Sequence, residues 1–179
     1  MRFNRTFPMP GIRKVDVKVH YYPLEDAVAL QYRMDMINYY QFWSHNGREV
    51  FRKALEAYKA DYEERNLDRR DRQSRRKYGT ANGYIMWFTH AFSVRAFSGT
   101  DLELGYLFED GSPYFTVNQK PVEHYDDHLN ESRTLQIMTT YFTRAQADEL
   151  AALFDEDFLE AVIPARSVPN STTVDVDEY

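Results

Sequence analysis

Residues 84–94 read YIMWFTHAFSV, and their apolar side chains recur at every second position. A period of two is typical of a β-strand, because successive side chains point to opposite faces of a sheet. Tyr84 and Met86 share one face, while Ile85 and Trp87 lie on the other. Because both faces are apolar, we expect a central strand that is covered on both sides.

Alternating runs also occur before and after this stretch. Val15, Val17 and Val19 alternate with polar residues, and a second run follows at 28–36 after a break at 23–26. This arrangement predicts an antiparallel hairpin. Three further strands are predicted at 102–108, 114–119 and 135–141, with a turn at 110–113 between the first two.

A first helix is predicted after the second strand of that hairpin. Asn46 is a good N-cap residue, and Glu49 follows it three positions later, as in a capping box. An apolar stripe with spacings of four, three and four is formed by Phe51, Leu55, Tyr58 and Tyr62. We therefore expect a helix over about 47–66.

A second helix is predicted near the end of the chain. Thr143 and Gln146 have the Thr-x-x-Gln spacing of a capping box, and apolar residues then recur at helical spacing through 147–154. A short helix is expected to follow through Val162. It should end at Pro164, because proline cannot continue a helix without breaking its hydrogen bonds.

The order of these elements predicts the fold class. Strands joined by hairpins, with few helices between them, indicate an α+β fold. We expect a mainly antiparallel sheet of about six strands with two principal helices packed on it. The predicted domain spans 15–164, after an irregular lead-in at 1–14 that contains Pro8 and Pro10. The acidic end, 165–179, lacks apolar periodicity and is expected to be disordered.

The composition is rich in aromatic residues. Of 179 residues 16% are aromatic, and tyrosine and phenylalanine provide most of them, with 14 and 12 copies. A chain of this length can bury a core without a metal or a disulfide. Two interpretations follow: an aromatic core in a strand-rich domain, which we favour, or a binding surface lined with tyrosine.

Cysteine is absent from the chain, which excludes disulfides, thiolate zinc sites and a cysteine nucleophile. No stretch approaches the roughly 18 apolar residues of a membrane-spanning helix. The N-terminus has charge but no apolar run behind it, so no signal peptide is predicted. We expect a soluble protein, and the compartment is left open.

Residues 65–77 form a strongly basic segment. Its basic residues are Arg65, Arg69, Arg70, Arg72, Arg75, Arg76 and Lys77. With two acids against these seven, the segment carries a charge of +5 and the rest of the chain carries −11 (−6 minus +5). A solvated helix end or loop would explain the segment. If it binds a partner, an acidic protein or a second copy is favoured over nucleic acid, because the acidic remainder would repel phosphates.

The densest group of potential metal ligands lies in a predicted polar loop at 121–132. These ligands are His124, Asp127, His128 and Glu131. If this stretch were helical, His124 and His128 would face the same way and, with a carboxylate, could hold zinc or iron. A metalloprotease helix needs a glutamate after its first histidine, but Tyr125 stands there. An exposed loop with solvated histidines is the simpler interpretation, and no cofactor is predicted.

Two classes of function therefore stay open. The favoured class is a non-catalytic binding or assembly module that contacts an acidic partner through the basic segment. The alternative is a metal-dependent, hydrolase-like enzyme that uses the His124 and His128 loop. The module is favoured because catalysis needs several positioned groups, and only one cluster could supply them. The sequence also contains no phosphate-binding glycine loop, serine nucleophile elbow or dinucleotide-binding fingerprint.

Overall fold

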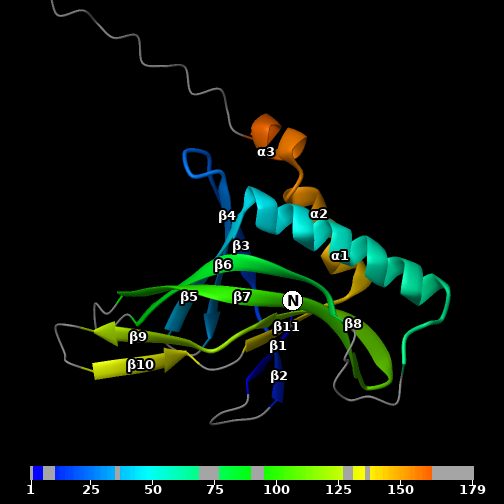
Figure 1. The fold of residues 1–179 in the computed structure, drawn as a ribbon, viewed down its shortest axis with the longest axis horizontal. Helices are drawn as coiled ribbons and strands as arrows, with labels where there is room; N and C mark the ends of the chain where they lie inside the picture. The colour runs from blue at the N-terminus through cyan, green and yellow to red at the C-terminus, as the bar shows by residue number, and fades with distance from the viewer. Residues whose placement is uncertain are drawn as a thin grey trace, which may run out of the picture.

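A computed structural model of the chain describes most of its length. The described residues are 2–5, 11–34, 37–68, 77–89, 95–126, 131–135 and 138–162. Within these ranges the chain forms an α+β structure in which helices pack on a large antiparallel sheet (Figure 1). The fold class predicted from the alternating runs is therefore confirmed.

Nine strands of the described ranges form the main sheet, in the order β2-β1-β11-β8-β7-β6-β5-β4-β3. Their bounds are Arg2–Arg5 (β1), Gly11–Lys14 (β2), Val17–Tyr22 (β3), Ala27–Met34 (β4), Ile37–Ser44 (β5), Lys77–Thr89 (β6), Arg95–Glu109 (β7), Ser112–Gln119 (β8) and Met138–Phe142 (β11). Every neighbouring pair is antiparallel. The sheet is larger than the six strands expected, because β1 and β2 extend it beyond β11 and β5 is a further strand between β4 and β6.

The two end strands of this sheet are consecutive in sequence. Only Val15 and Asp16 separate β2 from β3, although these strands stand at opposite ends of the strand order. Consecutive Cα atoms are 3.8 Å apart, so Lys14 and Val17 can be separated by at most about 11 Å. The sheet must therefore curl until its two edges approach each other at this corner. An inner and an outer face result.

Three helices and a small hairpin complete the described structure. The helices are His45–Glu63 (α1), Arg144–Leu153 (α2) and Glu156–Val162 (α3). Figure 1 shows α1 and α2 on the same side of the main sheet. The hairpin pairs Val122–Asp126 (β9) with Glu131–Leu135 (β10) as a separate two-stranded sheet that lies against β7.

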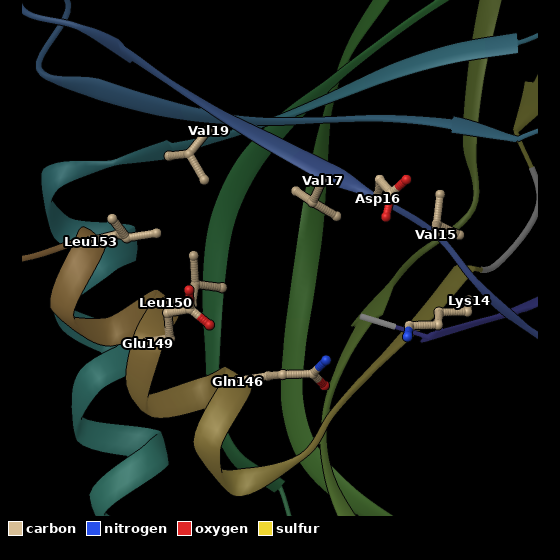
Figure 2. A pocket seen from close by; sticks show the side chains of 9 residues that line it. All are labelled: Lys14, Val15, Asp16, Val17, Val19, Gln146, Glu149, Leu150 and Leu153. Atoms are coloured by element: carbon tan, nitrogen blue, oxygen red, sulfur yellow. The ribbon is translucent and has the colours of Figure 1, made fainter.

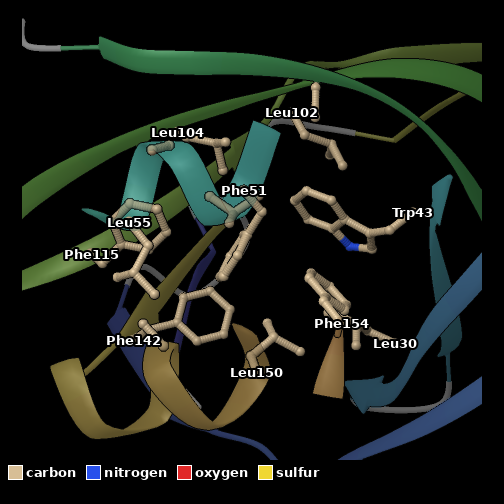
Figure 3. Packing of buried hydrophobic residues seen from close by; sticks show 14 of the residues in the cluster. Leu30, Trp43, Phe51, Leu55, Leu102, Leu104, Phe115, Phe142, Leu150 and Phe154 are labelled. Atoms are coloured by element: carbon tan, nitrogen blue, oxygen red, sulfur yellow. The ribbon is translucent and has the colours of Figure 1, made fainter. Parts of the chain in front are cut away.

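The main core lies between α1, α2 and the inner face of the sheet (Figure 3). Phe51 of α1 is fully buried at its centre. Its ring meets the rings of Trp43, Phe115 and Phe154 edge-on, at centroid distances of 5.6, 5.3 and 5.2 Å. Such edge-to-face pairs stabilise beyond the area that they bury. In this cluster the aromatic residues form the core, as the favoured interpretation of the composition predicts.

A second apolar cluster occupies the part of the inner face that α1 does not cover. Tyr32, Tyr39 and Trp87 of the main sheet belong to this cluster, together with Val122 of β9. Leu135 of β10 packs against the cluster. The small hairpin therefore covers this end of the sheet. Helices and hairpin together make the inner face the interior of the protein.

Tyr58, two turns beyond Phe51 on α1, gives a testable dependence on pH. It is fully buried, and its hydroxyl donates to the carbonyl oxygen of Pro113 at 3.3 Å. Burial raises the pKa of Tyr58 from 10.0 to about 12, and Tyr62 adds to this while the Arg144 guanidinium opposes it. The folded protein therefore favours the neutral Tyr58 side chain. The stabilisation that follows from this preference is complete below pH 10.

We expect this contribution to be lost as the pH rises from about 10 towards 12, because the unfolded chain then releases the Tyr58 proton first. A shift of this size corresponds to roughly 2–3 kcal/mol of unfolding free energy. Urea unfolding at pH 8 and near pH 12 should show a smaller alkaline loss in Tyr58→Phe than in the unaltered protein. Equal losses in the two proteins would contradict this expectation.

Local signals were correct in some places and misleading in others. The capping box of Thr143 and Gln146 is present in full at the start of α2. At α1, however, the N-cap is Ser44, whose hydroxyl accepts from the Gly47 amide at 3.2 Å, so the expected cap at Asn46 is wrong. Ser44 serves because it is the last residue of β5 and keeps an extended conformation there.

The expectation of an irregular lead-in is also wrong where the structure describes it. β1 pairs with β11, and β2 pairs with β1, so both extend the main sheet. The proline and glycine signals of this segment lie between two short strands, and β2 itself begins at Gly11. Residues 165–179, the expected disordered end, lie outside the described residues.

Candidate functional site

A groove lies between the edge strand β3 and helix α2 (Figure 2). Its volume is about 210 Å³. The lining residues are Lys14, Val15, Asp16, Val17, Val19, Gln146, Glu149, Leu150 and Leu153. It therefore sits at the corner where the two edges of the curled sheet approach each other, with α2 forming its opposite wall.

Five of the nine residues that line the groove are apolar. Val17 and Val19 point from β3 towards Leu150 and Leu153 of α2 in Figure 2. Val19 is 37% exposed, whereas Leu150 is buried. The side chains at alternate positions of β3 face the groove because the period of a strand is two. An exposed valine beside a buried leucine leaves apolar surface open to a ligand.

The polar residues of the groove are one lysine, two acids and one glutamine. Lys14 and Asp16 lie at the β2–β3 corner, and Gln146 and Glu149 lie on α2. Among the described residues, neither the Asp16 nor the Glu149 carboxylate has an ion-pair partner. Both acids are available to a positively charged group of a ligand.

The backbone of β3 has one open side. Within the described part of the chain, β3 pairs with β4 and with no other strand. An edge strand presents N–H and C=O groups that can pair with another extended chain. The groove and this open edge lie side by side, since Val17 and Val19 belong to both.

The outer face of the sheet carries aromatic rings next to this edge. Tyr22 of β3 meets Phe42 of β5 at 5.7 Å between ring centroids, and Tyr40 meets Phe88 of β6 at 5.8 Å. Tyr84 is 52% exposed on the same face, so the expectation that β6 is covered on both sides is wrong at that position. No described helix lies on this outer face, which explains the exposure.

Only the two ends of the predicted basic segment belong to the described residues. Arg65 is exposed just after α1 and has a left-handed backbone conformation with φ of 59°. Lys77 begins β6, and its ammonium group donates to the Glu103 carboxylate at 3.0 Å. Arg69, Arg70, Arg72, Arg75 and Arg76 lie outside the described residues. A partner contact through this segment stays a prediction.

Glu103 reduces the charge that Lys77 offers to a partner. Its second carboxylate oxygen pairs with Lys120 at 3.1 Å, so one acid lies between two lysines. The hydrogen bond from Lys77, and then the contact with Lys120, lower the pKa of Glu103 against the opposing effect of burial. The Lys77 charge is therefore partly balanced inside the protein.

The predicted metal ligands lie around the small hairpin. His124 belongs to β9 and Glu131 to β10, while Asp127 and His128 lie outside the described residues. His124 thus lies in a strand, and the helical spacing that would align it with His128 does not apply at that residue. The structure describes no side chain of these four positions, so a metal site there stays a prediction.

The groove residues were not identified from the sequence as functional. Val17 and Val19 were recognised as one face of a strand, and Leu150 and Leu153 fall in the apolar run of the second helix. Nothing in these spacings indicates which strand forms the edge of a sheet, because pairing partners are set by long-range contacts. The short β2–β3 connection indicates the edge only once Arg2–Arg5 and Gly11–Lys14 are known to be strands.

Comparisons with known proteins show the family of the chain. No curated protein and no solved structure matches it. None of the described helices has the length and apolar character needed to cross a membrane. A family model with the description "Uncharacterised Treponema protein" matches residues 1–161. The match spans all the described strands and nearly all of α3, and the chain belongs to this family.

Proposed function

We propose that the protein is a non-catalytic binding module that takes an extended segment of a partner protein as an added strand at β3. The observation that carries this proposal is the open edge of β3 beside an apolar groove. In strand addition, main-chain hydrogen bonds give affinity and pockets for alternate side chains give specificity. The open edge of β3 and the apolar groove stand next to each other at this corner of the sheet.

The chemistry of the groove defines the partner segment. Alternate side chains of an added strand would lie on the inner side, next to Leu150 and Leu153. Those side chains should be apolar, because burying them against Val19 removes apolar surface from water. Asp16 and Glu149 favour a lysine or arginine in the same segment. We therefore propose an extended, alternating apolar segment with at least one basic residue.

We also propose that the basic segment 65–77 contacts acidic groups of a partner. Its local charge of +5 against −11 for the rest of the chain supports this interpretation. Reversing the charge at Arg69, Arg70, Arg75 and Arg76 should then weaken capture of an acidic partner without changing the melting temperature. The alternative enzyme function at the His124 and His128 loop gains no support from the described residues.

The strand-addition proposal can be tested with two matched variants. Val19→Lys places a charge on the edge of β3, where lysine opposes pairing with a further strand. Leu24→Lys makes the same chemical change at a residue that is 96% exposed in the turn after β3, away from the groove. Both proteins should keep the melting temperature of the unaltered chain, since both sites are exposed.

The probe is a displayed library of random ten-residue peptides selected on the unaltered protein. We expect enriched peptides with alternating apolar residues, binding that shifts the methyl signals of Val17 and Leu153, and about tenfold weaker binding to Val19→Lys than to Leu24→Lys. Equal binding to both variants, or no enrichment, would refute the proposal. Sedimentation that shows dimers abolished by Val19→Lys would instead identify a second copy as the occupant.

A further inference from the structure

Three potential metal ligands from distant parts of the sequence meet at one end of α1. Asp26 lies in the turn between β3 and β4, His45 is the first residue of α1, and Glu156 is the first residue of α3. Their ligand atoms all lie within 4.8 Å of one another. We propose that Asp26, His45 and Glu156 bind a divalent transition-metal ion, with Zn²⁺ as the ion that fits best.

The two distances from His45 to the carboxylates agree with a tetrahedral site, and all three ligand atoms lie within 4.8 Å of one another. Zinc bonds to nitrogen and oxygen are about 2.0–2.2 Å long, so two ligands of a tetrahedron lie about 3.3–3.6 Å apart. His45 Nδ1 is 3.4 Å from Asp26 Oδ2 and 3.6 Å from Glu156 Oε1. An ion can therefore enter between these atoms with small side-chain movements.

The donor set also favours zinc over harder ions. One imidazole and two carboxylates suit zinc, whereas calcium and magnesium prefer oxygen ligands alone. Three protein ligands leave a fourth position for water or for a ligand atom of a partner. The three side chains are 45–59% exposed, so an ion could reach the site from solvent.

A buried arginine outside the ligand set orients Asp26. The side chain of Arg48 is 2% exposed, and it donates to Asp26 Oδ1 at 2.6 Å and to the Asp26 carbonyl oxygen at 2.8 Å. This contact occupies one carboxylate oxygen and leaves Oδ2 facing His45. Partners of this kind, which fix a ligand without touching the metal, are typical of metal sites.

The charges around the site are compatible with a cation. Asp26 and Glu156 bring two negative charges, and Arg48 offsets one of them. The N-terminus of α1 acts against a bound cation, because its free N–H groups carry a partial positive charge. The two carboxylates and the His45 imidazole must outweigh this effect. Without metal, His45 contacts the same two carboxylates directly.

A bound ion would join three separate elements of the fold. It would connect α3 to the turn before β4 and to the start of α1. This site lies apart from the groove between β3 and α2, since the two sets share no residue. Binding of metal and binding of a strand can therefore be tested independently.

The test uses the full chain after treatment with a chelator and dialysis. Zn²⁺ is titrated calorimetrically at pH 7.5, and Co²⁺ is used to report a tetrahedral site through its visible absorption. We expect one ion per chain and a rise in melting temperature of roughly 5–10 °C at a free Zn²⁺ concentration near 100 times Kd. Absence of stoichiometric binding would overturn the proposal.

Three single-histidine variants locate the ion. His45→Ala should weaken Zn²⁺ binding at least tenfold and remove the thermal shift. His20→Ala is the matched control, because His20 lies on β3 and is hydrogen-bonded to Gln31 at 2.7 Å, away from the site. His128→Ala should also leave binding intact. Zinc that is lost only in His128→Ala would refute this site and favour the predicted loop instead.

Discussion

Replacing Phe51 by alanine should lower the free energy of unfolding by about 3–5 kcal/mol. Phe51 is fully buried and lies between the inner face of the sheet and α2. Its removal leaves a cavity beside Trp43, Phe115 and Phe154, and it removes four edge-to-face ring contacts at once, the fourth with Phe142. Rigid neighbours from separate elements can close such a cavity only in part, so the loss falls in the upper range for core substitutions.

Urea unfolding followed by circular dichroism measures this effect. Phe158→Ala is the matched control, because Phe158 lies on α3 and is 42% exposed. The control should cost clearly less than Phe51→Ala, since 42% of the Phe158 surface already contacts water. A cost below 1 kcal/mol for Phe51→Ala would contradict the central place of this ring in the core.

Replacing Asp26 by alanine has the second largest expected effect, about 3 kcal/mol of lost stability. The substitution leaves the Arg48 guanidinium buried with only the carbonyl oxygen of residue 26 as a named partner. A buried charge that loses its counter-ion keeps its desolvation cost without compensation. The backbone of Asp26 also has φ of 43°, a conformation that alanine tolerates less well than aspartate or asparagine.

Two comparisons separate these causes. Asp26→Asn keeps the backbone tolerance and one acceptor oxygen, so it should cost less than Asp26→Ala. Adding Arg48→Met to Asp26→Ala should recover part of the loss, because the double variant no longer buries an unpaired charge. Arg52→Ala breaks exposed pairs with Glu49 and Asp155 and should change stability by no more than about 1 kcal/mol. If the double variant is no more stable than Asp26→Ala, the charge explanation fails.

Local patterns in the sequence predicted most of the elements. The alternation at 84–88 and the turn at Asp110 and Gly111 identified strands and a hairpin correctly, because side-chain period and turn chemistry are local properties. The capping box of Thr143 and Gln146 is also predicted correctly, because it too is a local property. The predicted N-cap of α1 is wrong because Ser44 and Asn46 are both good N-cap residues. The end of β5 at Ser44 decides between them.

The arrangement of the strands could not be predicted from such patterns. Nothing local in Arg2–Arg5 indicates that it will pair with Met138–Phe142 near the other end of the chain. The curl of the sheet depends on that pairing, and the groove at β3 depends on the curl. The edge position of β3 therefore follows from contacts between residues that are distant in sequence.

The proposed metal ligands show the same limitation. Asp26, His45 and Glu156 are far apart in sequence, and each belongs to a different local pattern: a turn, the start of one helix and the start of another. A search for closely spaced histidines and acids selects His124 and His128 instead. Only the folded chain, which brings the turn at Asp26 and the start of α3 beside the start of α1, unites the first set.

The most direct test of the open β3 edge is amide hydrogen exchange with and without a peptide selected on the protein. Strand addition predicts slower exchange at outward-facing amides of Val17–Tyr22, with no change in β8, which is paired on both sides inside the sheet. Protection confined to other elements, with β3 amides exchanging as fast as in the free protein, would contradict the proposed mode of binding.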